Sequence, residues 1–231
     1  MNKATLALLS FAVALVACGK KDAAELTGAA PAAPVTQAAA APAPAVEPAP
    51  SPSAEPSAEQ REAEQKRQLM AYAEMEDRYI NDPRAQWATA AKASSSFGEA
   101  TPPASATESR AWKATGAVDG SEWQNNQQDI GFDWLDLDFA KPVRATEVRI
   151  VVPHGDGVEA ISKLELRDVD GKLHTVWSDI SDVKRDKRGA RTWFVRSFEK
   201  TTFQARGVKL TIANNVERGY KGVDAVQLVG D

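Results

Sequence analysis

Few residues of this 231-residue chain have side chains that could catalyse a reaction. Asp136 and Asp138 lie two positions apart in one candidate strand, so their carboxylates would be about 6–7 Å apart, a spacing that glycoside hydrolysis can use. Solvated carboxylates on a sheet face are far more common, and we adopt that interpretation. The two histidines, His154 and His174, lie in a glycine-containing loop and a candidate hairpin strand. No nucleophile-elbow, phosphate-loop or zinc motif occurs, so the sequence predicts no catalytic residues.

The segment 213–222 has the residue types that bind sugars. Asn214 and Asn215 offer amides, Arg218 offers a forked cation, and Tyr220 offers an aromatic face with a polar tip. Because the segment joins two predicted strands, it is held at both ends and loses little entropy on binding. The alternative, in which Tyr220 covers the edge of the fold and Arg218 is solvated, fits the pattern equally well.

A second candidate surface is the basic run 181–191, which contains Lys184, Arg185 and Arg188. Such a run is usually a solvated hairpin tip, but it could also contact anionic polysaccharide or lipid head groups. Trp112 and Trp123 lie in the long loop region before the first alternating strand and could stack on a ligand. For each tryptophan, packing in the core is the better expectation.

The only cysteine, Cys18, follows a stretch with the pattern of an export signal. Lys3 is positive and residues 4–17 are apolar or small, which is too short for a spanning helix of about 20 residues. Leu15–Cys18 resembles the lipobox of bacterial lipoproteins, which implies cleavage after residue 17 and a lipid on the Cys18 thiol. The alternative is an ordinary secretory signal. Gly19, where aspartate would imply retention at the inner membrane, implies the outer membrane by the same resemblance.

The lone cysteine also excludes an internal disulfide and any cysteine-based metal cluster.

Residues 18–56 are expected to form the lipid anchor and a disordered spacer. Eleven of the 13 prolines lie between residues 31 and 103, most of them within 31–56, among many alanines. Such a stretch cannot bury enough apolar surface to offset the entropy of ordering it. At ~3.1 Å per residue in an extended conformation, it could reach on the order of 100 Å.

A helix is predicted over residues 57–84. Ser57 and Gln60 fit a capping box at its start, and Asn81–Pro83 ends it. The apolar stripe at helical spacing consists of Leu69, Tyr72, Met75 or Glu76, and Tyr79. This stripe is narrow and strongest in the second half, which favours packing against the chain's own domain over a coiled coil.

Residues 85–231 contain seven or eight short strands with period-2 alternation, and Asp170-Gly171 is a strong hairpin turn. In the strand 133–139, Leu135, Leu137 and Phe139 share one face. The predicted strands are Trp87–Ser95, Asp133–Phe139, Ala145–Val152, Ile161–Arg167, Lys172–Ser178, Arg191–Phe198, Gly207–Ala213 and Gly222–Val229. The pattern predicts an all-β fold, an antiparallel β-sandwich.

The charge balance argues against a dedicated nucleic-acid binder. The formal net charge is −4, and residues 85–231 hold 20 basic and 21 acidic residues. A nucleic-acid-binding domain would be net basic. The sandwich is instead close to neutral and has no overall field to steer a charged partner.

Several pieces of the predicted sandwich occur in an order found in a known family. They are Ala93–Ser95, Ala117–Gly120 followed by Trp123, Trp134–Phe139, Pro142-Val143 with Glu147–Ile150, Gly207–Ile212 and Val223–Leu228. Together they resemble the discoidin, or coagulation-factor C-type, branch of the galactose-binding-like jelly rolls over nearly all of residues 87–230. The resemblance implies a jelly-roll sandwich and a non-catalytic module that binds glycans, lipid head groups or proteins.

The same resemblance implies a possible structural calcium after the Asp-Gly pair. Its ligands here would be Asp119, the carbonyl of Gly120, Ser121 or Glu122, and Asp224. Because calcium takes six to eight oxygen ligands, this set is incomplete, and a purely structural turn is preferred.

These patterns together predict a lipid-anchored, non-catalytic binding module of the cell envelope. Its partners would be a membrane, through the lipid on Cys18, and a glycan or another envelope ligand. The alternative is an interaction lipoprotein whose β-sandwich binds a protein partner, and no nucleic acid is expected.

Overall fold

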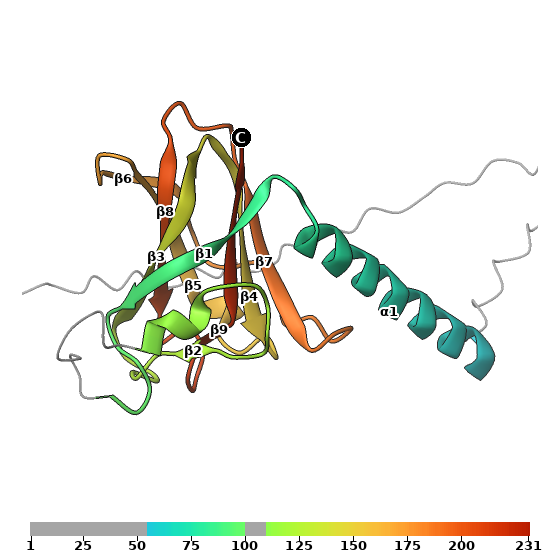
Figure 1. Cartoon of the computed structure of the whole chain (residues 1–231). Coiled ribbons are helices and arrows are strands. Elements are labelled where there is room, and N and C mark those ends of the chain that lie inside the picture. Colours follow the sequence, from blue (N-terminus) through green and yellow to red (C-terminus); the bar gives the residue numbers. More distant parts are fainter. Residues whose placement is uncertain (1–54, 100–109) are drawn as a thin grey trace, which may run out of the picture. The chain divides into compact units, whose positions relative to one another are not determined.

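The computed structural model describes residues 55–99 and 110–231. One α-helix comes first, and antiparallel strands follow it (Figure 1). The predicted signal peptide, Cys18 and nearly all of the predicted spacer lie outside these residues, so they stay predictions. Within the described part, no helix is long and apolar enough to cross a membrane.

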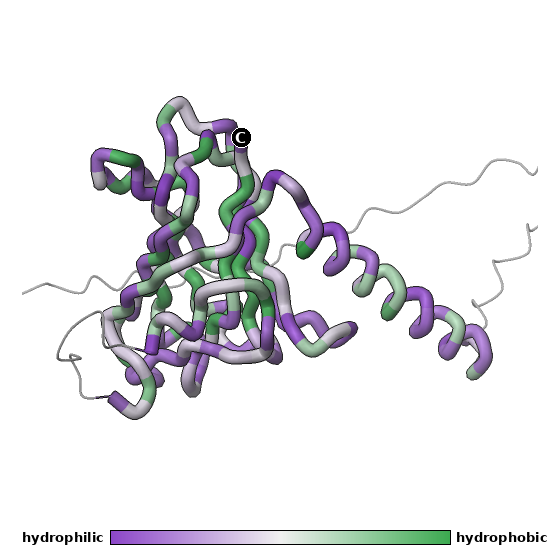
Figure 2. Tube along the Cα trace, in the orientation of Figure 1, coloured by the Kyte–Doolittle hydropathy of each residue, from purple (hydrophilic) through white to green (hydrophobic). Residues whose placement is uncertain are grey.

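The helix α1 (Ala58–Ile80) begins as the sequence predicts. The Ser57 side chain accepts a hydrogen bond from the Gln60 backbone at 3.2 Å, and the Gln60 side chain accepts one from the Ser57 backbone at 2.8 Å. This capping box satisfies two N–H groups that the first turn leaves free. The first turns of α1 are hydrophilic, whereas strands β4 (Ala145–Pro153) and β10 (Ala225–Gly230) carry long hydrophobic runs (Figure 2).

Two antiparallel sheets share one strand, β1 (Ala85–Ala93). The first sheet has the order β6-β5-β8-β3-β1 and the second the order β1-β10-β4-β7. The remaining strands are β3 (Phe132–Val143), β5 (Ile161–Asp168), β6 (Leu173–Ser178), β7 (Arg191–Ser197) and β8 (Ala205–Ala213). A separate small ladder joins β2 (Trp123–Gln124) to β9 (Gly222–Val223), and two short 3₁₀ helices are η1 (Arg110–Ala114) and η2 (Val158–Ala160).

Strand β1 passes from one sheet to the other. Its residues 85–87 pair with β10, and its residues 88–93 pair with β3, with an irregularity in register between Ala88 and Ala90. Such an irregularity bends a strand and increases its twist. The bend lets the two sheets face each other, and Figure 1 shows β1 crossing obliquely over the other strands. The predicted antiparallel jelly-roll sandwich is confirmed.

The core lies between the two sheets. Leu135, Leu137 and Phe139 of β3 point inward, as their alternation predicts, and belong to the same buried cluster as Val148 and Ile150 of β4. The β5–β6 hairpin turns at Asp170-Gly171, where Gly171 has a φ of +84°, a conformation that glycine adopts without strain.

The last predicted strand is interrupted at one residue in the structure. The sequence pattern predicts one strand over Gly222–Val229, but the structure has β9 and β10 with Asp224 between them. The Asp224 carboxylate accepts hydrogen bonds from the backbone N–H groups of Asp119 and Gly120, at 3.4 and 3.3 Å. The interruption therefore lets one buried side chain hold the loop around residue 119.

The second half of α1 packs on the outer face of the β7-β4-β10 sheet, as the apolar stripe predicts. The Tyr72 hydroxyl donates to the Arg191 carbonyl at 2.8 Å, and the Trp193 indole donates to Glu76 at 3.1 Å. The rings of Tyr79 and Trp193 lie 5.1 Å apart. Leu69 was expected in the same stripe but is exposed, because the contacts with the sheet begin only at Tyr72.

Candidate functional site

The strand registers gather four connecting segments at one end of the sandwich. Ala93 pairs with Leu135, Phe132 pairs with Ala213, and Ala225 pairs with Val151. These pairings bring together the described residues 94–99 and 110–131 of the first connection and the segments 154–160, 179–190 and 214–224. We call this end of the sandwich the loop end. It contains every candidate ligand-binding and calcium residue predicted from the sequence.

A buried polar network forms the base of the loop end. The Asp133 carboxylate accepts hydrogen bonds from the Ser94 and Ser95 hydroxyls at 2.6 and 2.9 Å. It also accepts from the amides of Asn125 and Asn214, at 3.1 and 3.0 Å. Asn214 is fully buried in this network. In this structure its amide therefore joins two loops and does not face solvent.

A buried ammonium ties the loops together. Lys221 is only 1% exposed, and its Nζ donates to the backbone carbonyls of Gln128, Asn214 and Gly219. Burial lowers the pKa of this ammonium. Gly157 lies against it: a Cβ there would come within 2.5 Å of Lys221 Cγ, so the position has no room for a side chain. Lys221 therefore joins the segment 214–224, through two of its carbonyls, to the segment that contains Gln128.

Trp123 is a core residue, in line with the preferred expectation. Its ring is fully buried, and its indole N–H donates to the Ser95 carbonyl at 3.0 Å and the Ser96 hydroxyl at 3.2 Å. It fixes the loop that follows β1 against β2. Its ring does not reach the surface where a ligand could stack.

A small pocket opens at the loop end, with a volume of about 100 Å³. It is lined by Phe97, Arg110, Lys113, Glu122 and Gln124. Phe97 follows β1, and its N–H donates to the Gln124 carbonyl at 2.9 Å. Arg110 and Lys113 come from η1, while Glu122 and Gln124 come from the residues at β2. We call these five residues the loop-end pocket.

The loop-end pocket combines an aromatic face with several polar groups. The Phe97 ring is 45% exposed. The Glu122 carboxylate accepts a hydrogen bond from the Gln124 amide at 2.6 Å, and burial raises the pKa of Glu122. Arg110 donates to the Phe97 carbonyl at 3.3 Å. An aromatic face beside an amide, a carboxylate and two cations can stack on a sugar ring and bond its polar substituents.

Two of the predicted aromatic residues lie beside this pocket. The Tyr220 ring meets the Phe97 ring edge-on, with centroids 4.6 Å apart. Trp112 lies on η1 between the two pocket cations and is 61% exposed, so the expectation that it packs in the core is wrong. In a 3₁₀ helix, residues three apart share a face. Ala111 and Ala114 occupy the buried face of η1, which turns Trp112 outward.

The other exposed residues of segment 213–222 lie away from the buried network. Asn215 and Arg218 are exposed, whereas Asn214 and Lys221 are buried. The segment that was predicted as one binding loop is therefore divided. Part of it holds the loop end together, and part of it, including Tyr220, lies at the surface.

The three named cations of the predicted basic surface are paired within the chain. Lys184 binds Glu159 at 2.5 Å, and Arg185 lies 3.6 Å from Asp156. Arg188 binds Asp186 at 2.7 Å, and its guanidinium lies 5.8 Å from the centre of the Tyr72 ring of α1. The neighbouring Gly189 touches the same ring so closely that a Cβ would overlap it. Arg188 and Gly189 of this run thus pack against Tyr72 of α1.

The residues at the predicted calcium position do not fit a calcium ion. Asp224 faces the backbone N–H groups of Asp119 and Gly120, and burial raises the pKa of its carboxyl. Asp119 itself accepts a hydrogen bond from the Ser121 backbone at 2.7 Å. Hydrogen-bond donors therefore surround the carboxylate where calcium would need oxygen ligands. Across residues 55–99 and 110–231, no group of three or more His, Cys, Asp or Glu residues could hold a metal ion.

The paired carboxylates of β3 are bound to a cation. Arg167 donates to Asp136 at 3.1 Å and to Asp138 at 2.7 Å, on the outer face of the first sheet. His174 bonds Asp168 at 2.7 Å and stacks on Phe203. These groups are used in structural ion pairs and ring contacts away from the loop end.

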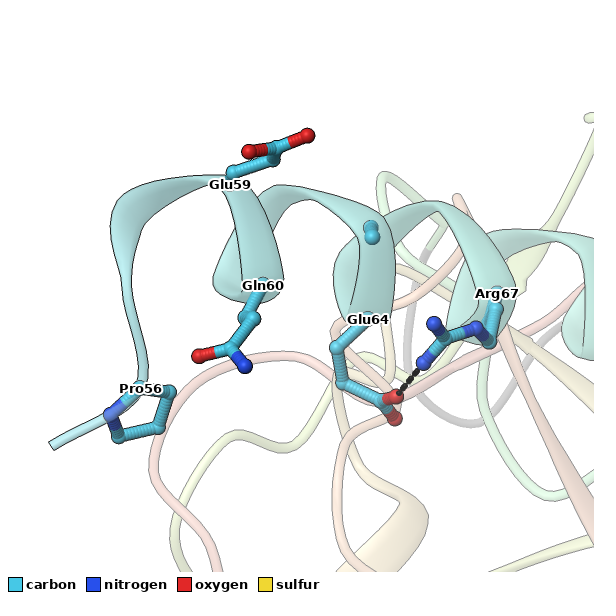
Figure 3. Close-up of a pocket in the computed structure, with 6 residues that line it drawn as sticks. Pro56, Glu59, Gln60, Glu64 and Arg67 are labelled. Atoms are coloured by element: carbon cyan, nitrogen blue, oxygen red, sulfur yellow. Dashed lines mark hydrogen bonds and ion pairs between the residues drawn. The ribbon is translucent and has the colours of Figure 1, made fainter. Parts of the chain in front are cut away.

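Another hollow lies along the first turns of α1 and is lined by Pro56, Glu59, Gln60, Ala63, Glu64 and Arg67. Figure 3 shows that its walls come from one helix and the residue before it, with Glu64 and Arg67 paired at 2.9 Å. No second element closes it, so it is the open face of a helix. The loop-end pocket is the better candidate site.

The fold and the loop end define a discoidin-type β-sandwich with a small polar pocket among the loops at one end. Residues 90–223 match the family model described as F5/8 type C domain. The match covers more than half of the chain, and the chain belongs to the F5/8 type C domain family. The family predicted from the sequence is confirmed.

Solved carbohydrate-binding modules have similar folds at low identity. The family 32 module of Clostridium perfringens NanJ, in complex with galactose, is 16% identical, with a TM-score of 0.42 over 62% of this chain and 98% of that chain. CBM32-1 from a family 31 glycoside hydrolase of the same organism is 14% identical, with a TM-score of 0.46 and coverage of 64% and 99%. A chitosan-binding module from a chitosanase/glucanase of Paenibacillus sp. IK-5 is 12% identical, with a TM-score of 0.45 and coverage of 61% and 94%.

No curated protein sequence matches the chain. Its function is therefore inferred from its own residues.

Proposed function

We propose that this chain is a non-catalytic glycan-binding module of the cell envelope. The loop-end pocket carries the proposal, because it places the exposed Phe97 ring beside the Gln124 amide and the Glu122 carboxylate. An aromatic ring packs on the apolar face of a sugar, and planar amide and carboxylate groups bond its hydroxyls. At about 100 Å³, the pocket accommodates part of one sugar ring, so further contacts would come from the exposed rings beside it.

The test uses Phe97→Ala with Phe132→Ala as its matched control. Both rings are exposed at the loop end, but Phe132, which is 69% exposed, does not line the pocket. The full chain is screened on an array of bacterial, plant and animal oligosaccharides. For any oligosaccharide bound, Phe97→Ala should weaken binding by about tenfold, which corresponds to about 1.4 kcal/mol. Equal binding by Phe97→Ala and the unmodified chain would rule the pocket out.

One observation favours the second candidate, a module that binds a protein partner. Besides Trp112, four large apolar side chains of the loop end are more than half exposed: Ile130, Phe132, Ile180 and Val216. Exposed apolar side chains that gather in one area mark protein interaction sites. If Phe132→Ala abolishes capture of an envelope protein while oligosaccharides are not bound, this second function is the correct one.

The envelope location is the other part of the proposal and rests on the Leu15–Cys18 pattern. In a Gram-negative host, Cys18→Ser should remove lipid labelling and release the protein from the membrane fraction. The Gly19 neighbour favours fractionation with the outer membrane. If the Cys18→Ser protein still sediments with membranes after a high-salt wash, the anchor is not the cysteine lipid.

A further inference from the structure

The cations of the loop-end pocket differ from the three named cations of the predicted basic surface. Lys184, Arg185 and Arg188 each lie within 3.6 Å of a carboxylate. Among the residues that the structure describes, the Lys113 ammonium forms no ion pair or hydrogen bond. It is half-buried, so it is positioned in the pocket rather than fully solvated.

Arg110 is only loosely paired. Its Nε lies 3.9 Å from Glu99, beyond hydrogen-bond distance, and one of its N–H groups donates to the Phe97 carbonyl at 3.3 Å. Its side chain is half exposed. Because a guanidinium has five N–H donors in a planar fork, most of the donors of Arg110 remain able to bind a ligand.

The pocket's own carboxylate does not neutralise these cations. Glu122 is bonded by Gln124, and no ion pair joins it to Arg110 or Lys113 in the described residues. Glu99 is the carboxylate nearest to Arg110, so with Glu99 and Glu122 ionised the charges around the pocket balance. Lys113 has no such partner and most donors of Arg110 are unfilled, and charged donors without partners in a partly closed pocket favour an anionic group on the ligand.

The geometry of the Arg110 guanidinium and the Phe97 ring indicates which kind of anionic ligand fits the pocket. A planar guanidinium matches a planar carboxylate with two parallel hydrogen bonds, and the neighbouring ammonium adds a second charge-assisted contact. The exposed Phe97 ring, supported edge-on by Tyr220, needs an apolar face to pack against. A sugar ring that bears a carboxylate offers both features in one unit.

We propose that the loop-end pocket binds a carboxylate-bearing sugar, namely a uronic acid residue of an acidic polysaccharide. The carboxylate binds Arg110 and Lys113, the ring packs on Phe97, and Gln124 bonds a ring hydroxyl. This inference rests on the proposed glycan-binding function and specifies its ligand class.

The test compares three tetrasaccharides by calorimetry on the full chain at low salt. They are tetragalacturonate, the neutral galactose tetramer of the same linkage, and a sulfated galactose tetramer. Tetragalacturonate should bind about tenfold more tightly than the neutral tetramer, and more tightly than the sulfated one. Arg110→Gln and Lys113→Gln should each reduce this preference by about threefold or more, and the double variant should abolish it. Arg206→Gln changes an exposed arginine of β8 that lines no part of the pocket, so it should keep the preference.

The outcomes separate this inference from the broader function. If the neutral and acidic tetramers bind equally and both need Phe97, the pocket binds glycans but the uronic acid inference is wrong. A preference for tetragalacturonate that survives in the double variant also overturns it. Tighter binding of the sulfated tetramer would show that the site recognises charge without selecting a carboxylate, and would overturn it too. If no tetramer shows Phe97-dependent binding, the uronic acid inference fails, and the oligosaccharide array alone decides whether the pocket binds another glycan.

Discussion

The Lys221 ammonium stabilises the loop end, because one side chain bonds the backbone of neighbouring segments. It bonds three backbone carbonyls in two of the connecting segments, and it is almost completely buried. Asp224 does similar work with its carboxylate, which holds the N–H groups of Asp119 and Gly120. Both charged groups bond backbone instead of a ligand or a metal. The side chains left to meet a ligand are those of the loop-end pocket.

Lys221→Met should destabilise the fold, because it leaves three buried carbonyls without their donor. We expect the free energy of unfolding in urea to fall by about 2–4 kcal/mol. Lys187→Met removes an exposed lysine of another loop and should leave stability within about 0.5 kcal/mol of the original. An unchanged unfolding free energy in Lys221→Met would mean that the ammonium does not hold the loops.

Glu122 should make uronic acid binding depend on pH. Burial raises the pKa of Glu122, so the carboxyl takes up a proton at a higher pH than a free glutamate. As the pH falls from 7 towards 5, its repulsion of the ligand carboxylate decreases, and affinity for tetragalacturonate should rise. Glu122→Gln should bind more tightly at pH 7 and show a flatter pH profile.

The comparison isolates Glu122 because the other charged groups around it are unchanged in the variant. His154, Asp156 and Asp224 influence the same carboxyl. If Glu122→Gln keeps the full pH dependence of the unmodified chain, one of these groups, and not Glu122, controls it.

Among the elements, α1 is joined to the sandwich by specific polar contacts as well as by apolar packing. At its end, Arg149 of β4 donates to Asp82 at 2.8 Å and to the Tyr79 carbonyl at 3.3 Å. Burial raises the pKa of Asp82, but hydrogen bonds from Arg84 and Arg149 outweigh this effect and lower the pKa to about 2. The ionised carboxylate therefore stabilises the junction between the helix and the second sheet.

The lowered pKa of Asp82 predicts a specific loss of stability in acid. Because the folded-state pKa lies below the unfolded-state value, the contribution is complete above about pH 4 and is lost as the pH falls through about 2. Asp82→Asn should cost about 2 kcal/mol of unfolding free energy at pH 7. The difference between variant and unmodified chain should close near pH 2, as urea titrations at several pH values would show. A difference that stays constant across this range would contradict the role of the ionised form.

Most of the elements could be predicted from local patterns. Alternation in 133–139 and the Asp170-Gly171 turn predict strands and a hairpin, and Ser57 with Gln60 predicts the start of α1. These signals lie within a few residues of the element that they describe. The bend of β1 and the break at Asp224 could not be predicted, since both depend on partners more than 40 residues away in the sequence.

The pocket was missed from the sequence for the same physical reason. Phe97, Arg110 and Glu122 lie far apart in the sequence, and only the fold brings them together. Of the predicted ligand residues, Tyr220 and Trp112 lie beside the pocket, while Trp123 and Asn214 are buried. The (i, i+3) spacing of Ala111 and Ala114 is the local signal that could have indicated an outward Trp112.

For the whole molecule, the proposed ligand is selected by local charge and not by a global field. The net charge is −4, and the sandwich is nearly balanced, so an acidic polysaccharide gains no long-range attraction. The positive charge that matters is confined to Arg110 and Lys113. Because such short-range contacts are screened by salt, binding of tetragalacturonate should weaken moderately between low and physiological ionic strength.

A two-dimensional NMR titration of the ¹⁵N-labelled full chain with tetragalacturonate tests most directly where the glycan binds. The shifted amide signals should be confined to Phe97, η1, residues 122–124 and Tyr220, and the same shifts should need about tenfold more ligand in Phe97→Ala. If instead the largest shifts fall on the outer face of the first sheet, around Lys92, Asp136 and Arg167, or if no amide shifts at all, the loop-end pocket is not the glycan-binding site.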